Sequence, residues 1–556
     1  MDRRQFLYTG FGATALLLWG GGCKSSGTGS TSIRFGDDRG PALPPGQLPP
    51  AARPTIRMAG GGDVAPSPFN SPPPSFGQLA YVYDTLLMSD RDGNVIPWLA
   101  SGFERSSDGL RYTFELRKNI TWHDGKPLTA EDVAFTFQYY KAQDALLPPF
   151  VIFRPQNVAE VRALSELTVE FRLDKAAVTF PREVAARIPI VPRHIWSSIK
   201  DAGKAREVEV LVGSGPYRLE SSTPAQGSYL YTANESFFLG KPFVKRIELR
   251  PVGEGLTALV AKEIDVGGTG FPGTTDDALA PFQAAPFRII DGRSDFLAAL
   301  YWNQSKGGAL ADVRFRQACA MAIDRNDIVK RLGGGRAEPG NPGFLPKAHA
   351  YHVEVEQYAF DLDAANRLLD QAGYPRSKPG GVRTGPDGKP LRFKTLVAVE
   401  TASLVEVLVP ALRAVGVELD LDPAEIVGVL TNQGEYEMAV LIYGGISGDP
   451  NYMRSVYSSR VKKTFQAARG YADAEFDDLA DRQLVTTDVE ERKKLVARMQ
   501  QIVARDLPIL HLYYPTPFLI YNRDTFDEWS TQYSEKQVFV TGARDGSLEI
   551  RPIKEP

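Results

Sequence analysis

The sequence predicts a mixed α/β protein of several domains. Strand-like and helix-like stretches alternate irregularly from Thr55 onward, and the chain has no internal repeat. Its 556 residues correspond to three or four domains at about 150 residues per domain, or to fewer domains with large lobes. Hydrophobic residues make up 43% of the chain and charged residues 24%, which excludes wholesale disorder and fibrous repeats.

The chain is close to neutral and has only short apolar runs. Its 64 lysines and arginines are balanced by 67 acidic residues, so the net charge is -3 and nucleic acid is not an expected partner. The longest apolar runs, such as 438–446, are far shorter than the ~20 residues of a membrane-spanning helix. With only two cysteines, Cys23 and Cys319, the chain has no disulfide framework.

Residues 1–23 form a predicted targeting signal. Arg3 and Arg4 precede an apolar stretch at 6–19 and three glycines at 20–22, which suit cleavage by a signal peptidase. The segment RRQFL resembles a twin-arginine export signal. We predict that Cys23, the next residue, is lipidated and anchors a periplasmic or other extracytoplasmic lipoprotein to a membrane. Simple cleavage that leaves an unmodified Cys23 is the alternative.

Residues 24–54 are rich in serine, glycine and proline and have little to bury. This composition predicts a flexible tether whose proline-rich half holds the folded part away from the bilayer.

The first elements after the tether follow from local patterns. The segment IRMAG, residues 56–60, predicts a strand, and residues 110–118 alternate apolar and polar side chains as a half-buried strand does. A polar turn at 123–126 follows, in which His123 is expected to be solvated. Thr129, with Asp132 three residues later, predicts the N-terminus of a helix through a capping box.

Later helices have equally clear ends. Each of three predicted helices starts at an aspartate that can cap it. The second of them ends at Gly373, and the third ends before Pro508. A stripe of apolar residues on the helix after Asp312 predicts that Cys319 is buried and packs as a small hydrophobic residue. The predicted helices begin after Asp312, Asp361 and Asp488, and strand-rich segments are predicted at 509–520 and 537–552.

The residues predict no catalytic site, no cofactor and no metal site. The motifs HExxH, GxSxG and GxxxxGK[ST] are absent. Residues 268–273 fit GxGxxG, but the preceding strand is short and Pro272 interrupts the entry to a helix, so an ordinary loop is predicted. His349 and His352 are spaced for metal binding on a helix, yet residues 352–358 alternate like an edge strand.

Seven blocks, read together, resemble one protein family. The segment WLASGFERSSDGLRYTFELRKNITWHDGKPLTAEDVAFTF, which starts at Trp98, is similar to the signature region of the family 5 extracellular solute-binding proteins of ABC importers. The later blocks match in the same order, and the resemblance spans about Thr55 to Trp529. They are GSGPYRL, ALVAKEIDVG, DVRFRQACAMAIDRNDIV, YAFDLDAANRLLDQAGYP, GGISGDPNY and the closing RMQQIVARDLPILHLYYP.

The resemblance implies a periplasmic binding protein-like α/β fold with two lobes and an extra inserted domain (cluster C type). Domain I would combine residues 55–85, 195–298 and 515–556. Domain II would be the insertion 86–194, and domain III would be residues 299–514. Two chain crossings between the lobes would act as a hinge, and the lobes would close around the ligand.

The resemblance also implies ligand-binding residues. In peptide-binding members the ligand lies as an added strand against two segments, which correspond here to residues 59–61 and 442–444. Ile446 stands where peptide binders have an aspartate for the ligand's ammonium group, so a neutral, glycosidic or otherwise amine-free solute is as open as a peptide. Tyr443 is either a pocket residue or core packing, and Asp449 either orders a turn or contacts ligand. The full predicted set is Ala59, Gly60, Gly61, Trp302, Asn303, Ile442, Tyr443, Gly444, Ile446 and Asp449.

The function implied is that of an ABC-transporter substrate-binding protein, not an enzyme. It would be a monomer that captures a peptide or other small solute and delivers it to the permease subunits. Two alternatives are a hydrolase on the same scaffold, using Asp449 or the pair His349 and His352, and a sensor that presents its ligand to a signalling partner.

Overall fold

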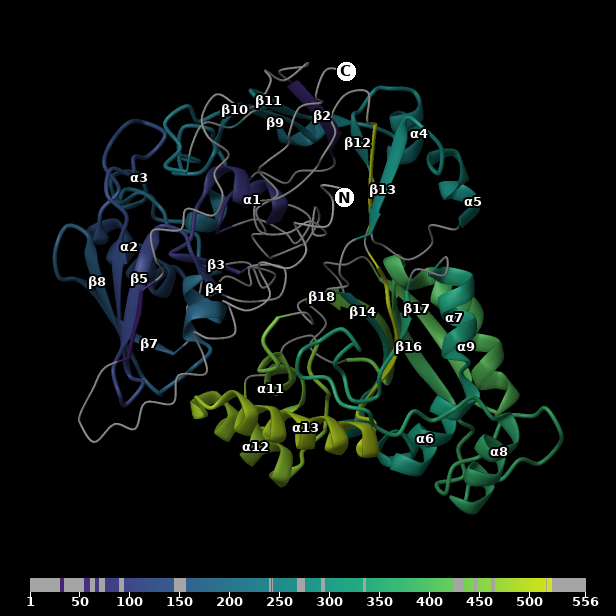
Figure 1. Cartoon of the computed structure of the whole chain (residues 1–556). Helices are drawn as coiled ribbons and strands as arrows, with labels where there is room; N and C mark the ends of the chain where they lie inside the picture. The colour runs from purple at the N-terminus through teal and green to yellow at the C-terminus, as the bar shows by residue number, and fades with distance from the viewer. Residues whose placement is uncertain are drawn as a thin grey trace, which may run out of the picture.

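Three large sheets organise the molecule (Figure 1). The computed structural model of the chain describes residues 31–34, 55–60, 66–69, 76–89, 95–144, 157–239, 242, 244–267, 276–291, 296–333, 337–424, 435–444, 448–461, 466–516 and 518–522. Gly61, Ile446, Cys23, the glycine motif at 268–273 and the predicted strands at 537–552 lie outside these residues.

A five-stranded antiparallel sheet has the order β1-β5-β6-β8-β7. Helix α2 covers it, and the predicted capping box of that helix is confirmed, since Thr129 N donates to Asp132 Oδ2 over 3.0 Å. The elements of this region are β1 (Thr31–Arg34), β5 (Ala100–Arg105), β6 (Arg111–Leu116), α2 (Ala130–Gln143), β7 (Val158–Ala163), β8 (Thr168–Leu173), α3 (Arg193–Trp196) and the hairpin β3 (Leu87–Ser89) and β4 (Val95–Pro97).

Strand β1 differs from the sequence prediction. Residues 31–34 fall inside the predicted flexible tether, yet they pair antiparallel with β5, with Ile33 opposite Phe103. Edge strands offer unpaired backbone groups, and a short extended segment of the same chain satisfies them without needing a hydrophobic sequence of its own.

A seven-stranded sheet has the order β13-β20-β12-β2-β11-β10-β9 and collects strands from distant parts of the chain. Strand β2 lies at the centre of this sheet and pairs parallel with β11 on one side and with β12 on the other. The elements are β2 (Thr55–Gly60), α1 (Phe76–Val82), β9 (Tyr217–Thr223), β10 (Ser228–Ala233), β11 (Arg246–Pro251), α4 (Gly255–Val260), β12 (Val266–Gly267), α5 (Asp276–Leu279), β13 (Phe287–Asp291) and β20 (Phe518–Asn522).

A six-stranded sheet has the order β15-β19-β14-β18-β16-β17 and helices on both faces (Figure 1). Successive residues of β14 enter different cores: Leu300 packs with α6 and α9, and Tyr301 with α11 to α13. The elements are β14 (Phe296–Trp302), α6 (Val313–Ala322), α7 (Arg325–Leu332), β15 (Glu338–Pro339), α8 (Leu362–Gln371), β16 (Arg392–Ala398), α9 (Ala402–Ala414), β17 (Glu418–Ala424), β18 (Met438–Gly444), α11 (Tyr452–Tyr457), α12 (Ala474–Val485), α13 (Val489–Asp506) and β19 (Ile509–Tyr514).

The sheets form two lobes. The five- and seven-stranded sheets share one hydrophobic core, in which Phe114 and Tyr231 are both buried, and we call this part lobe 1. Lobe 2 is built on the six-stranded sheet. The chain passes from lobe 1 to lobe 2 between β13 and β14 and returns between β19 and β20. The predicted strand-rich segment 509–520 is therefore divided between two sheets.

The predicted helix starts in lobe 2 are confirmed. The carboxylates of Asp312, Asp361 and Asp488 accept hydrogen bonds from backbone N–H groups in the first turns of α6, α8 and α13. Cys319 is fully buried, also as predicted. The predicted edge strand at 352–358 is wrong, because this segment runs without strand partners; Glu338 and Pro339 pair with β19 instead.

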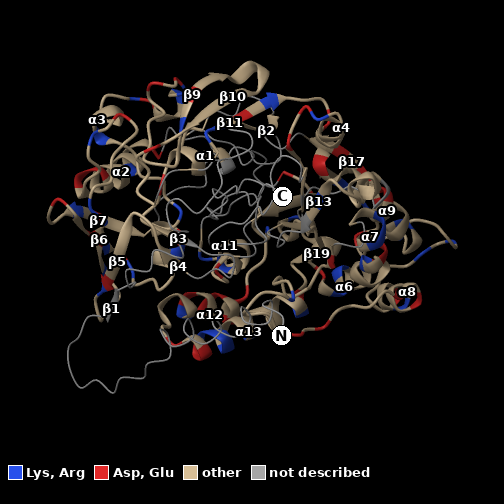
Figure 2. Cartoon of the chain, turned by 45° about the horizontal axis from the view of Figure 1, so that its top comes forward, with Lys and Arg blue, Asp and Glu red and all other residues tan. Residues whose placement is uncertain are grey.

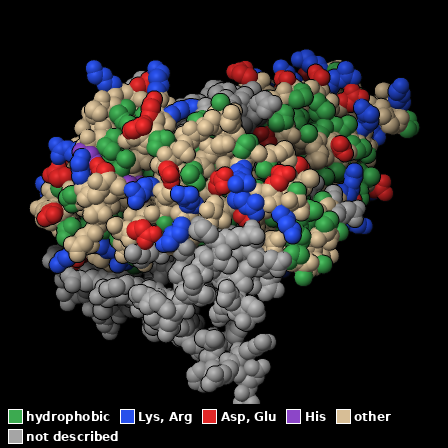
Figure 3. Space-filling model, turned by 90° about the horizontal axis from the view of Figure 1, so that it is seen from above, with side chains coloured by type: hydrophobic (Ala, Val, Ile, Leu, Met, Phe, Trp, Pro, Cys, Tyr) green, Lys and Arg blue, Asp and Glu red, His purple; other side chains and the backbone are tan. Residues whose placement is uncertain are grey.

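Charged side chains of both signs are interspersed over the described surface (Figures 2 and 3), as the small net charge leads one to expect. Among the described residues, no helix is both long enough and apolar enough to cross a membrane.

Candidate ligand-binding site

The end of β2 has one flank without a strand partner in the described part of the chain. Ala59 and Gly60 pair with Arg250 and Pro251 of β11, whereas β12 reaches β2 only at Met58. Gly60 is needed for packing, since a Cβ atom at this position would lie 2.2 Å from the carbonyl oxygen of Gly227. The backbone of 59–60 can therefore accept an added strand on the β12 side.

The end of β18 has the same property in lobe 2. Tyr443 and Gly444 pair with Leu297 and Phe296 of β14. On the other flank β16 pairs with β18 only as far as Val440. Two strand ends, one in each lobe, thus leave one side of their backbone free of strand partners among the described residues, which is the geometry that strand addition requires.

The side chains at the end of β18 face the cores on either side of the sheet. Ile442 lies in the core with α6 and α9, and Tyr443 lies on the other face, 4% exposed. The ring centroid of Tyr443 is 6.2 Å from that of Tyr301 and 6.3 Å from that of Tyr452. Burial raises the pKa of Tyr443 well above its usual value. Core packing is therefore shown for Tyr443, while a contact with ligand stays a prediction.

Asp449 orders the turn that precedes α11, as one of its two predicted roles requires. Its Oδ1 accepts from Asn451 N over 2.8 Å, and Arg492 donates to both carboxylate oxygens. Burial acts to raise the pKa of Asp449, but the charge and hydrogen bonds of Arg492 outweigh it and hold the pKa below the usual value. The carboxylate is 5% exposed and already paired, so it has little capacity left for a ligand ammonium group.

A part of lobe 1 that carries no recognisable motif lies against this turn. The short helical segment Pro181–Ala185 places Arg182 Nη1 3.9 Å from Asp449 Oδ2. Close by, Val178 N donates to Leu484 O of lobe 2 over 2.8 Å. No local sequence pattern indicates these contacts, because they join segments about 270 to 300 residues apart.

Trp302 and Asn303, predicted to line the site, have structural roles. The Trp302 side chain is 1% exposed and its ring lies 6.2 Å from that of Phe315 in the core of lobe 2. Asn303 is equally buried; its Nδ2 donates to Tyr436 O over 2.9 Å and its Oδ1 accepts from Ser305. For both residues a ligand contact remains a prediction.

His349 and His352 hold loops of lobe 2 together. His349 Nε2 lies 3.0 Å from Gly448 O, next to the turn of Asp449. His352 Nδ1 lies 3.0 Å from Leu345 O. Among the described residues no cluster of three or more histidine, cysteine or acidic side chains is placed to hold a metal ion.

The prediction of a solvated His123 is wrong. Its Nε2 lies 2.9 Å from Gly215 O and its Nδ1 accepts from Gly213 N over 3.3 Å. Burial lowers the pKa of His123 to about 4. The polar turn that carries it is exposed, but the ring turns inward onto the segment GSGPY, residues 213–217. No local pattern in the sequence indicates this inward orientation.

A separate hollow of about 380 Å³ lies over the seven-stranded sheet. It is lined by hydroxyl and charged side chains, and none of the predicted ligand-binding residues lines it. The lining residues are Thr55, Ser221, Ser222, Thr223, Ser228, Tyr229, Leu230, Arg246, Glu248, Leu249 and Arg250.

Solved structures share this architecture. The oligopeptide-binding protein AppA of Bacillus subtilis, in complex with a nonapeptide, matches with a TM-score of 0.74 and 20% identity over 89% of this chain and 99% of that chain. NikA of Brucella suis, in complex with Fe(III)-EDTA, matches with a TM-score of 0.75 and 23% identity over 87% of this chain and 98% of that chain. These likenesses show the fold: two α/β lobes of the periplasmic binding protein type.

Sequence comparisons reach the same group of proteins. A putative ABC transporter peptide-binding protein of Brucella ovis is 29% identical over 344 residues, which are 58% of this chain and 62% of the relative's length. The heme-binding protein A of Haemophilus influenzae is 26% identical over 77% of this chain and 80% of its own length. Residues 94–465 match the model of the bacterial extracellular solute-binding proteins, family 5. The chain therefore belongs to family 5 of the bacterial extracellular solute-binding proteins.

Proposed function

We propose that this protein is the extracytoplasmic substrate-binding component of an ABC transporter, which captures a solute between its lobes and delivers it to the permease. The observation that carries the proposal is the pair of strand ends, β2 in lobe 1 and β18 in lobe 2, each with one flank free of strand partners in the described residues. Two chain crossings join the lobes, as a hinge needs.

Capture follows from a closure equilibrium. Contacts that a solute makes with both lobes exist only when the lobes are closed, so binding shifts the population toward the closed state. A micromolar solute contributes about -8 kcal/mol, which suffices to close a hinge that is balanced within a few kcal/mol.

We propose a peptide or another small solute as ligand. Relatives are named as peptide-, heme- and nickel-binding proteins, and a solved neighbour holds mannohexaose, so the fold accommodates several chemical classes. Ile446, at the position where peptide binders carry an aspartate, favours a solute without a free amine. Asp449 does not replace that aspartate, because Arg492 already pairs with it.

We propose that the solute leaves chemically unchanged. The hydrolase alternative relied on Asp449 or on His349 and His352, and each of these side chains is engaged with the protein itself. Presentation to a signalling partner in place of import stays an alternative that uses the same closed form.

The proposed topography follows the sequence prediction. Export through a twin-arginine-like signal would leave Cys23 lipidated and the folded lobes outside the cytoplasm as a monomer. We also propose the division into domains I, II and III; the strands that each sheet collects support it, apart from β1, which precedes residue 55, and β14, which begins at Phe296.

Small-angle scattering with a small-molecule extract of the host tests the proposal. Protein freed of solute by unfolding and refolding should become more compact and melt at a higher temperature when the extract is added. Mass spectrometry of the released solute should find its mass unchanged. An unchanged envelope and melting temperature would contradict the proposed capture, and a cleaved solute would favour the hydrolase.

A further inference from the structure

Five charged side chains meet where lobe 1 contacts the turn of Asp449. Lobe 2 contributes Asp449 and Arg492, and lobe 1 contributes Arg182, Glu183 and Arg187. Three guanidinium groups thus face two carboxylates. The cluster carries at least one positive charge in excess.

The two carboxylates are satisfied without Arg182. Both oxygens of Asp449 accept from Arg492, and Oδ1 also accepts from Asn451 N. The other carboxylate, Glu183, accepts from Arg187 Nη1 over 3.4 Å. Burial raises the pKa of Glu183 despite the opposing charge of Arg187, and any protonation of Glu183 increases the positive excess.

Arg182 is the incompletely paired member of this cluster. Its nearest carboxylate oxygen, on Asp449, is 3.9 Å away, and its side chain donates no hydrogen bond to another described residue. The side chain is only 22% exposed. A guanidinium group has five N–H donors arranged to meet a carboxylate or phosphate through two parallel hydrogen bonds, and partial burial strengthens such pairs.

The position of Arg182 relates it to the ligand-binding strand end. The turn it faces begins at Gly448, four residues after Gly444 at the end of β18. Arg182 itself belongs to lobe 1. A group of the solute that meets Arg182 near this turn would therefore be held between both lobes.

We propose that Arg182 binds an anionic group of the captured solute, a carboxylate or a phosphate, and selects for acidic solutes. This rests on the proposed function, which it makes more specific. The pair of Asp449 and Arg492 acts beneath the site as a neutral support that keeps the turn in place.

Thermal shift and titration calorimetry with fractions of a host small-molecule extract test this proposal. An anion-exchange resin divides the extract into an anionic and a non-anionic fraction, and both are applied to protein freed of solute by refolding. The anionic fraction should raise the melting temperature, and R182Q should lower the apparent affinity for it at least tenfold. R182K keeps the charge but not the paired donors, so its affinity for the anionic fraction should lie between those of R182Q and the unaltered protein. It replaces R182Q as the test variant if R182Q does not fold.

The matched control is R193Q, which removes another lobe 1 guanidinium, one exposed to solvent and paired with Glu131 over 3.2 Å. It should bind as the unaltered protein does. Phosphatase treatment of the anionic fraction identifies a phosphate by loss of binding, and carbodiimide amidation identifies a carboxylate in the same way.

Each other outcome has a definite meaning. Stabilisation by the non-anionic fraction alone, or equal affinity of R182Q and unaltered protein for the anionic fraction, would overturn the role of Arg182 and leave solute capture intact. Stabilisation by neither fraction nor by the whole extract would overturn the proposed function together with this inference.

Discussion

At the residue scale, a charged side chain is buried in the described part of this protein only where a specific partner compensates for its lost hydration. Asp449 and Arg492 are 5% and 9% exposed and pair through two hydrogen bonds. Removing one charge leaves the other buried without a counter-charge, and this costs more than the pair itself contributes.

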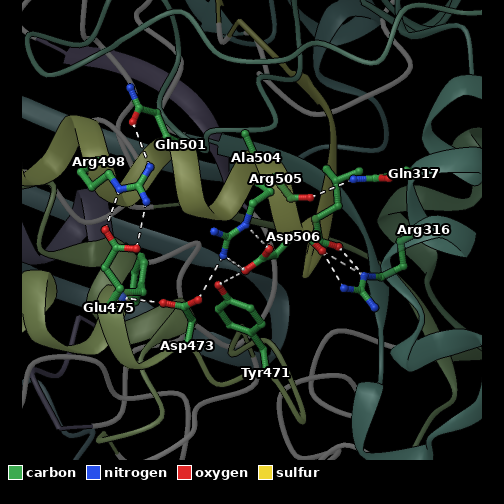
Figure 4. A network of polar contacts seen from close by, with 12 residues as sticks. Arg316, Gln317, Tyr471, Asp473, Glu475, Arg498, Gln501, Ala504, Arg505 and Asp506 are labelled. Carbon is green, nitrogen blue, oxygen red and sulfur yellow. Dashed lines mark hydrogen bonds and ion pairs between the residues drawn. The ribbon is translucent and has the colours of Figure 1, made fainter.

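We expect D449N to lower the free energy of unfolding by about 3–5 kcal/mol, as the loss of one partner of a buried ion pair does. Urea denaturation checks this. The control is E475Q, which breaks the exposed pair of Glu475 and Arg498, 2.7 Å apart, on the surface of α12 and α13 (Figure 4). It should leave stability within experimental error, because water and salt screen exposed pairs. Equal effects of the two variants would contradict this account.

His511 provides a pH dependence. It is fully buried, with Nδ1 2.6 Å from Asn341 O and Nε2 2.8 Å from Tyr457 Oη, and burial lowers its pKa from 6.5 to about 4. The unfolded chain therefore binds a proton at a higher pH than the folded chain does. Its contribution to stability is complete above pH 6.5 and is lost as the pH falls from 6.5 toward 4.

Acidification over that interval should remove about 3 kcal/mol of unfolding free energy through His511 alone, at 1.36 kcal/mol per pKa unit. Urea denaturation at several pH values measures the slope, and H511Q should reduce it, with the remaining slope due to His123, whose pKa burial also lowers to about 4. H194Q, which alters a partly exposed histidine paired with Asp124, serves as control. An unchanged slope in H511Q would show that another group causes the dependence.

At the element scale, the glycines of the GSGPY segment explain why this segment has so little freedom. A Cβ atom on Gly213 would lie 1.8 Å from the carbonyl oxygen of Val82, and one on Gly215 would lie 2.5 Å from that of Tyr81. The segment thus runs in backbone contact with the end of α1. The imidazole of His123 fixes it from the other side.

G213A should therefore destabilise lobe 1 by about 3 kcal/mol or more, because the clash involves backbone that cannot move aside as a side chain would. G253A is the matched control, since a Cβ atom there meets nothing within 4 Å. Thermal melting followed by circular dichroism compares the two. A G213A protein as stable as G253A would mean that α1 and the segment can separate at little cost.

At the scale of the whole molecule, the lobes differ in how they are assembled. Lobe 1 takes strands from the beginning, the middle and the end of the chain, and its two sheets share a core. All strands of lobe 2 come from one continuous stretch, residues 296–514. That stretch contains its own cores on both faces of the sheet.

A fragment of residues 296–516 should therefore fold alone with a cooperative unfolding transition, since both faces of its sheet stay covered. Calorimetry of this fragment, compared with the whole chain, checks the prediction. The complementary lobe 1 fragment that ends at residue 291 should fail to fold stably, because it lacks β20 between β13 and β12. A fragment 296–516 without a cooperative transition would show that lobe 2 depends on lobe 1.

Much of the local structure was predictable because its causes are local. The capping residues Thr129, Asp312 and Asp361 act on backbone groups two or three positions away, so the sequence alone places the helix starts. The ligand-binding role of the ends of β2 and β18 was predicted only through the family resemblance. No local pattern shows that their flanks lack strand partners among the described residues, because that depends on how far β12 and β16 pair with them.

The sequence by itself determined the mixed α/β class, the helix starts, the burial of Cys319 and the family to which the chain belongs. The tertiary structure decided that Arg492 and not a ligand pairs with Asp449, that His123 turns inward, and that Arg182 approaches from the other lobe. The physical reason is distance along the chain. Caps and periodic patterns act within a few residues, whereas burial and ion pairing at the site depend on segments that only the completed fold brings together.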